Sequence, residues 1–302
     1  MARVLLTGGS GFIAAHVLDT LLKRGYSVVT TVRSSEKADR IRAVHLNPGK
    51  ERLDFVIVED IAREGAFDDA VVSEPPFEAV IHTASPFHFN VTDVQKDLLD
   101  PAIQGTTGIL ESIVKYAPTA SESVPNGYRA SKTFAERAAW DFLEREKPNF
   151  TLSTLCPPQV FGPVVPQLSS LDTLNTSNQV IRDIVQGKFK SQIPPNATYT
   201  WIDVRDLALC HVLALERPGA ANKRFFLAAG FFSNKELVEV VRKNFDQYNE
   251  LLPSEDVPGG GYPEGGLYKI DNSRAVDILG IEWKSLDDSI ADTVKSLQAL
   301  GA

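Results

Sequence analysis

The chain has 302 residues, of which 43% are hydrophobic and 23% charged, and its formal net charge is −8 at pH 7. This length allows one large α/β domain, or a main domain with a smaller lobe, and it is long enough to bury a substantial core. The negative charge, with no cluster of Lys and Arg, argues against nucleic-acid partners and anionic membranes.

The location and the metal content are also constrained by composition. The two cysteines, Cys156 and Cys210, fit a reducing compartment, and Cys156 is expected to be a small buried residue and not a nucleophile. No metal-ligand spacing occurs. Because no run of 18 apolar residues is present and the apolar start is too short for a signal peptide, the sequence predicts a cytoplasmic protein.

A glycine-rich turn lies between the first apolar strand, Arg3 to Thr7, and an amphipathic helix. Gly8, Gly11 and Ala14 have the G-x-x-G-x-x-A spacing, in which small residues permit a tight turn and close approach of the backbone to a pyrophosphate. The free N–H groups of the following helix would face the phosphates. The alternative is a turn that binds nothing, but the second βα step that follows favours a dinucleotide site.

Basic residues follow the second strand, Ser27 to Val32. Arg33 follows this strand, and Lys37 and Arg40 lie in the next helix, which Ser34 can cap. An arginine at this position can pair with the 2′-phosphate of NADP, whereas an NAD site usually has an acidic residue for the ribose. The sequence therefore predicts NADPH as the cofactor; the alternative is that Arg33 lies on a solvated loop.

The later strands and helices alternate, as is typical of a parallel sheet covered on both faces. A third strand is predicted over Leu53 to Val58, a fourth over Ala79 to Thr83, and a long helix over about Thr92 to Tyr116. His82, inside the fourth strand, is expected to be satisfied in the core. The next strand is predicted over Phe150 to Leu155.

Tyr128 and Lys132 lie four residues apart, at the start of a helical pattern that continues to about Glu146. Residues at this spacing share one face of a helix. A nearby cation stabilises a phenolate, so such a tyrosine can exchange a proton with a carbonyl oxygen near neutral pH. The Y-x-x-x-K pattern alone usually has no catalytic meaning, but with the glycine turn it predicts a catalytic pair.

With these motifs the chain resembles the extended short-chain dehydrogenase/reductase family, which includes NAD-dependent epimerases and dehydratases. It is most similar to the fungal branch of NADPH-dependent carbonyl, methylglyoxal and ketone reductases, which is akin to the dihydroflavonol reductases. The resemblance covers nearly the whole chain. The matching segments are Thr7 to Ile13, Val32 to Ser34, Asp60-Ile61, His82 to Phe87, Gly105-Thr106, Tyr128 to Lys132, Pro157 to Pro163, and Trp201 to Asp206.

The resemblance implies a role for each part of the site. It places pyrophosphate at the glycine turn, the 2′-phosphate at the end of the second strand, and adenine beside the Asp-Ile pair. The nicotinamide half would lie between the exit of the fourth strand and the proline-rich segment. The cofactor-binding residues implied in this way are Gly8, Gly11, Phe12, Ile13, Arg33, Lys37, Asp60, Ile61, Thr83, Ala84, Ser85, Tyr128, Lys132, Pro157 and Val160.

One segment departs from the family pattern. Between the long helix and the Tyr-Lys helix the family has a buried fifth strand that ends in the catalytic serine. This chain has only Ala117 to Gly127, with two prolines and no apolar run, which predicts a loop. The fifth strand and the serine are therefore expected to be missing, and reduced activity is consistent with that loss. Whether Ser121 or Ser123 replaces the serine stays open.

The predicted fold class is α/β: a doubly wound parallel Rossmann sheet with a smaller C-terminal substrate lobe. The NADP-binding domain is expected over residues 1–162, with sheet contributions from about 198–228. The substrate lobe and closing helices are expected over 163–197 and 229–302.

The sequence thus predicts an NADPH-dependent reductase of aldehydes or ketones, with Tyr128 as the proton donor and a monomer or homodimer as the assembly. Phe87, Phe89 and Phe161 favour a small hydrophobic carbonyl substrate over a sugar nucleotide. Two alternatives stay open. A noncatalytic NADP-binding or regulatory protein is favoured by the missing serine strand, and a nucleotide-sugar epimerase or dehydratase is opposed by Arg33.

Overall fold

The computed structural model describes residues 2–46, 48–85, 93, 95–117, 121–125, 129–167, 171 and 174–301. The chain divides into two compact units. The first comprises Met1–Cys156 and Ala208–Phe225, and the second comprises Pro157–Leu207 and Phe226–Ala302.

The first unit is built on a seven-stranded sheet of order β3-β2-β1-β4-β5-β6-β9. Neighbouring strands from β3 to β6 pair in parallel, so their carboxyl ends meet at one edge. The order reverses between β1 and β4, which is the position where doubly wound sheets bind ligands. The predicted fold class is confirmed. The strands are β1 (Arg3–Thr7), β2 (Ser27–Val32), β3 (Leu53–Ile57), β4 (Ala79–His82), β5 (Ser121–Pro125), β6 (Leu152–Cys156) and β9 (Lys223–Phe226).

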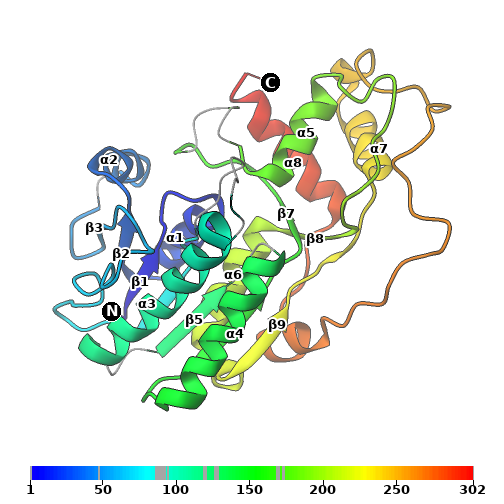
Figure 1. Cartoon of the computed structure of the whole chain (residues 1–302). Coiled ribbons are helices and arrows are strands. Elements are labelled where there is room, and N and C mark those ends of the chain that lie inside the picture. Colours follow the sequence, from blue (N-terminus) through cyan, green and yellow to red (C-terminus); the bar gives the residue numbers. More distant parts are fainter. Residues whose placement is uncertain are drawn as a thin grey trace. The chain divides into compact units, whose positions relative to one another are not determined.

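Helices cover both faces of this sheet (Figure 1). Alternate residues of a strand point to opposite faces, and β1 therefore contributes Val4 and Leu6 to one core and Leu5 to the other. The first core also contains residues of α1, α2 and α6, whereas α3 packs on the second face with α4 beside it. The bounds are α1 (Phe12–Lys23), α2 (Ser35–Val44), α3 (Asp100–Tyr116, preceded by the π-helical Gln95–Leu99), α4 (Arg129–Glu146) and α6 (Val204–Glu216).

The segment predicted to be a loop forms the strand β5, so that prediction was wrong. Ser123 lies opposite Ile81 on one side and opposite Ser153 on the other. The prediction relied on the absence of an apolar run, but hydrogen bonds to two flanking strands satisfy the peptide groups whatever side chains they carry. Pro125 is the last residue of the strand, where its missing N–H disturbs the ladder least. The sheet is therefore continuous from β4 to β6.

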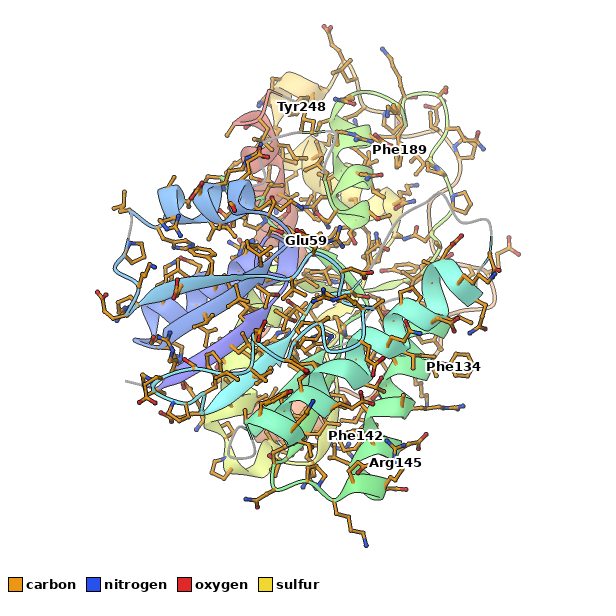
Figure 2. All side chains as sticks on the ribbon, turned by 60° about the vertical axis from the view of Figure 1, so that its left-hand side comes forward. Glu59, Phe134, Phe142, Arg145, Phe189 and Tyr248 are labelled. Carbon is orange, nitrogen blue, oxygen red and sulfur yellow. The ribbon has the colours of Figure 1, made fainter. Side chains whose placement is uncertain are left out.

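The second unit contains a three-stranded sheet of order β10-β8-β7 with its own core. Trp201 on β8 lies opposite Gly230 and Gln159, so β7 and β8 join this sheet although both were expected in the NADP-binding domain. Phe189 and Tyr248, labelled in Figure 2, belong to its core. The elements are β7 (Gln159–Phe161), β8 (Thr200–Asp203), β10 (Gly230–Phe231), α5 (Thr176–Val185), α7 (Asn234–Asn244) and α8 (Leu286–Gln298), with short turns of helix at Pro218–Ala220 in the first unit and at Asp246–Tyr248 and Ala275–Leu279 in the second.

Phe142 fastens α4 to the first unit. Its side chain is 2% exposed and packs with Leu110 of α3 and Leu152 of β6, whereas Phe134 on the same helix is 47% exposed (Figure 2). Among the described helices, none has both the length and the apolar character needed to cross a membrane.

Replacing Phe142 by alanine is expected to lower the free energy of unfolding by about 3 to 5 kcal/mol, because it leaves a cavity between two helices and a strand. Phe134→Ala is the matched control and should cost less than about 1 kcal/mol. Urea unfolding followed by circular dichroism measures both. Equal losses would contradict this account of how α4 is held.

Candidate active site

The glycine turn packs too closely for side chains. Gly8 has a φ of +75°, and a Cβ atom there would lie 2.9 Å from the Cα of Ala84. A Cβ at Gly9 would lie 2.2 Å from Oγ1 of Thr30. Gly11 is the N-cap of α1, and its N–H donates to the carbonyl of Gly8 at 2.8 Å. Because a glycine N-cap brings no side-chain oxygen, the first N–H groups of α1, at Phe12 and Ile13, receive no side-chain cap from it.

The hydroxyl of Thr7 connects the ends of β1 and β4. Its oxygen accepts the N–H groups of Thr83 and Ala84, each at 3.1 Å, and lies 2.9 Å from Nδ1 of His82. Since two N–H groups already point at this oxygen, the hydroxyl proton goes to Nδ1, and His82 is neutral with its own proton on Nε2. Burial lowers the pKa of His82 to about 3, in keeping with that state. The expectation that His82 is satisfied in the core is confirmed.

Lys132 lies on the first turns of α4 and donates from Nζ to Oγ of Ser85. This contact joins α4 to the exit of β4, directly after Thr83 and Ala84. Burial lowers the pKa of Lys132 to about 7. Tyr128, together with Phe87 and Phe89, lies outside the described residues.

The basic residues after β2 gather at the start of α2. Arg33 directly follows the strand, and both Arg33 and Lys37 are exposed. Ser34 caps the helix by accepting the N–H of Lys37. Arg40, one turn later, donates to Glu36 at 2.5 Å and is engaged there.

Asp60 and Ile61 follow β3 at the same edge of the sheet. The carboxylate of Asp60 accepts the N–H of Ala62 at 2.9 Å, which closes a tight turn. The side chain of Ile61 packs on α3, where a Cβ at Gly105 would come within 3.0 Å of it. The smallness of Gly105 therefore sets how close α3 lies to this turn.

The remaining predicted residues lie elsewhere. Pro157 and Val160 belong to the second unit, where the carbonyl of Val160 accepts from Asn175 at 3.4 Å. Phe161 is fully buried and stacks edge-on against Phe232, so it is a core residue and the expectation that it shapes a substrate site was wrong. Ser121 and Ser123 are the first and third residues of β5, and neither is at its carboxyl end.

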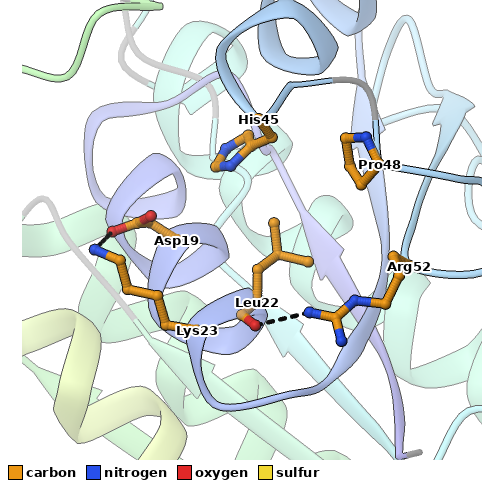
Figure 3. A pocket seen from close by; sticks show the side chains of 6 residues that line it. All are labelled: Asp19, Leu22, Lys23, His45, Pro48 and Arg52. Atoms are coloured by element: carbon orange, nitrogen blue, oxygen red, sulfur yellow. Dashed lines mark hydrogen bonds and ion pairs between the residues drawn. The ribbon is translucent and has the colours of Figure 1, made fainter.

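A pocket of about 260 Å³ lies at the opposite edge of the sheet, beside the end of α1 and the start of β3 (Figure 3). In it Lys23 pairs with Asp19 at 2.6 Å, and Arg52 donates to the carbonyl of Leu22 at 2.9 Å. His45 and Pro48 complete its wall. The pocket is not part of the site around Lys132. Within the described part of the chain, no group of His, Cys, Asp and Glu is placed to hold a metal ion.

Sequence reasoning missed the contacts of two residues, Thr7 at the site itself and Glu136 on the helix that carries Lys132. A threonine at the end of a buried strand, just before the glycine turn, was a usable signal for Thr7. Glu136 accepts hydrogen bonds from Thr154 and Arg224. These residues are far from it in the sequence, so no local pattern predicted the contacts.

Comparisons with known proteins agree with this architecture. The sequence model of the NAD dependent epimerase/dehydratase family matches residues 4–124 and 115–228. Ketoreductase azaE from Aspergillus niger is 44% identical over 330 residues, covering 98% of this chain and 97% of the relative. The putative NADPH-dependent methylglyoxal reductase GRP2 of Candida albicans is 38% identical, covering 96% and 98%. The crystal structure of Gre2 with NADPH from Candida albicans superimposes with a TM-score of 0.88 at 31% identity, covering 100% of both chains.

The same comparisons show a difference in length and a break in the family match. The two family matches overlap at residues 115–124, and the alignment with the Aspergillus protein spans 330 residues although this chain has 302. That relative therefore contains residues with no counterpart here. The break in the family match coincides with the end of α3 and with β5.

His82 is expected to make the protein less stable in acid. Its pKa is about 3 in the folded state and ordinarily 6.5, so its contribution is complete above pH 6.5 and is lost as the pH falls toward 3. The loss amounts to about 1.4 kcal/mol per pH unit. His82→Gln keeps an acceptor for Thr7 but does not titrate, and urea unfolding between pH 6.5 and 4.5 should show a shallower slope. An unchanged slope would show that His82 is not the titrating group.

Proposed function

The chain belongs to the NAD dependent epimerase/dehydratase family, and we propose from this that it is an oxidoreductase that uses NADPH to reduce aldehydes or ketones. The observation that carries the proposal is the contact of Lys132 with Ser85 at the switch point of the sheet, next to the glycine turn. Relatives that cover nearly the whole chain are named ketoreductase and NADPH-dependent methylglyoxal reductase.

The residues present fit NADPH. The turn leaves no room for a side chain between Gly8 and Ala84, and the start of α1 has no side-chain cap. Both features suit a pyrophosphate, which needs a close approach of the backbone and N–H donors. In the proposal Gly8, Gly11, Phe12 and Ile13 hold this group. Arg33 and Lys37 hold the 2′-phosphate, Asp60 and Ile61 lie by adenine, and Thr83, Ala84, Ser85, Pro157 and Val160 hold the nicotinamide half.

When bound, the nicotinamide supplies the hydride for the carbonyl carbon. Tyr128 donates the proton to the carbonyl oxygen, and the ammonium of Lys132 stabilises the phenolate that remains. Burial brings the pKa of Lys132 to about 7, so this amine gains and loses its proton near neutral pH. The ordinary pKa of a lysine is 10.5. The folded protein therefore loses stability as the pH falls from 10.5 to 7, because the buried amine then resists taking up a proton.

The alternatives have less support. The noncatalytic reading depended on a sheet without its fifth strand, and β5 is present. The carboxyl end of β5 brings no serine in its described part, so the orientation of the carbonyl falls to Tyr128 in this proposal. For the epimerase alternative, the solved structure of a UDP-glucose 4-epimerase is 20% identical to this chain, and that likeness shows the fold alone. A small hydrophobic substrate, a cytoplasmic location and a monomer or homodimer stay predictions.

Carbonyl-dependent oxidation of NADPH, followed at 340 nm with methylglyoxal and a panel of aliphatic and aryl ketones, tests the function. Tyr128→Phe is expected to lower kcat by about 10² to 10⁴, because it removes the proton donor while leaving the ring in place. Binding of NADPH should remain, as judged by nucleotide fluorescence. Intact nucleotide binding without turnover by the wild-type protein would favour the noncatalytic alternative.

Arg33→Ala is expected to weaken NADPH binding by about tenfold, equivalent to about 1.4 kcal/mol, and to leave NADH binding unchanged. Arg40→Ala is the matched control, since Arg40 lies nearby but is paired with Glu36. If Arg33→Ala weakened the binding of NADPH and of NADH equally, the assignment of Arg33 to the 2′-phosphate would be wrong.

A further inference from the structure

Glu136 lies on α4 one helical turn after Lys132, and residues four apart share a helix face. Its side chain is only 13% exposed. The carboxylate accepts a hydrogen bond from Oγ1 of Thr154 at 2.9 Å and another from Nε of Arg224 at 2.9 Å. The thiol of Cys156 lies 3.6 Å from its second oxygen. One side chain thus joins α4 to both β6 and β9.

The surroundings of Glu136 consist of donors. Burial, and next the charge of Glu136, raise the pKa of Cys156 to about 12, so its thiol keeps its proton and can donate. Taking a carboxylate out of water is costly unless charges and hydrogen bonds compensate it. Two polar side chains and one cation supply that compensation, whereas an apolar residue would need none. A buried carboxylate at this place therefore calls for a role beyond packing.

The geometry of α4 supplies such a role. Phe142 fastens the helix near its carboxyl end, and Lys132 reaches Ser85 near its start. A helix held only by apolar contacts can slide or rotate, and a shift of one turn moves a side chain by about 5.4 Å. The hydrogen bonds of Glu136 are directional, so they fix both the rotation of the helix and its position along the strands.

We propose that Glu136 is a positioning residue that, through Thr154, Cys156 and Arg224, fixes α4 against β6 and β9 and so holds Lys132 at Ser85. This inference rests on the proposed function, in which Lys132 belongs to the active site. Glu136 itself touches neither cofactor nor substrate in the proposal.

The titration of Lys132 in the protein without nucleotide tests the inference independently of turnover. The protein is prepared with lysine labelled with ¹³C and ¹⁵N, and the Cε resonance of Lys132 is followed by NMR against pH. The resonance is assigned by its absence from the spectrum of Lys132→Arg. Wild-type Lys132 should titrate near pH 7. In Glu136→Ala the helix is released and the amine regains water, so the midpoint should rise by about one pH unit.

The direction in which the Lys132 midpoint moves distinguishes a positioning role of Glu136 from an effect of its negative charge alone. If Glu136 acted only by its negative charge, removing it would lower the pKa of Lys132, because an opposite charge favours the ammonium. Glu136→Gln keeps acceptors for Thr154 and Arg224 without the charge, and its midpoint should stay close to that of the wild type. A midpoint that falls in both variants would overturn the positioning role.

Steady-state kinetics provide the second readout. Glu136→Ala should lower kcat by about tenfold with little change in KM for the carbonyl compound, and Glu136→Gln should restore most of it. Glu144, an exposed carboxylate on the same helix, gives the control Glu144→Ala, which should match the wild type in both measurements. If Glu136→Ala does not fold, Thr154→Val removes one of the donors to Glu136. This variant should lower kcat by about threefold and raise the Lys132 midpoint.

The outcomes separate the two proposals. A folded Glu136→Ala protein with wild-type kcat and an unchanged Lys132 midpoint would reject the positioning role alone. A wild-type protein without carbonyl turnover, in which Glu136→Ala still raises the Lys132 midpoint, would reject the proposed function and leave the positioning role standing.

Discussion

The hydroxyl of Thr7 is the contact on which the arrangement of the site depends. It satisfies the N–H groups of Thr83 and Ala84 where β4 leaves the sheet, and a buried N–H without a partner costs about 1 to 3 kcal/mol. With these two peptides fixed, Ala84 lies against Gly8 and the next residue, Ser85, faces Lys132. One hydroxyl group therefore sets the distance between the glycine turn and the amine of Lys132. It also explains why the neighbouring histidine has to remain neutral.

The continuity of the sheet follows from the lengths of its connections. Four residues, 117–120, separate α3 from β5, and three residues, 126–128, separate β5 from α4. Both lengths fall in the usual range of about two to six residues for such connections. The order strand, helix, strand, helix, strand is therefore complete between β4 and β6 although the relative is longer.

Local patterns predicted the first half of the Rossmann unit well, because its signals are local. The glycine spacing, the apolar run Ser27–Val32 and the cap Ser34 each act within a few residues, and the structure has all three. β5 escaped prediction because its flanking strands hold it, and its own side chains are mostly polar. Phe161 was misread since an aromatic residue in a turn-rich segment gives no sign of which core it enters. Glu136 was missed because its partners, Thr154 and Arg224, are 18 and 88 residues away.

The spacing of Lys132 and Glu136 shows why the contacts of the carboxylate matter for the amine. A lysine and a glutamate four residues apart on a helix commonly pair with each other, and such a pair would draw the ammonium along the helix and away from β4. Here one carboxylate oxygen of Glu136, Oε1, accepts from both Thr154 and Arg224, and Lys132 donates to Ser85 instead. The strands thus occupy the acceptor that would otherwise compete for the amine. Because burial lowers the pKa of Lys132 to about 7, a charged group placed beside this amine would shift its protonation near neutral pH.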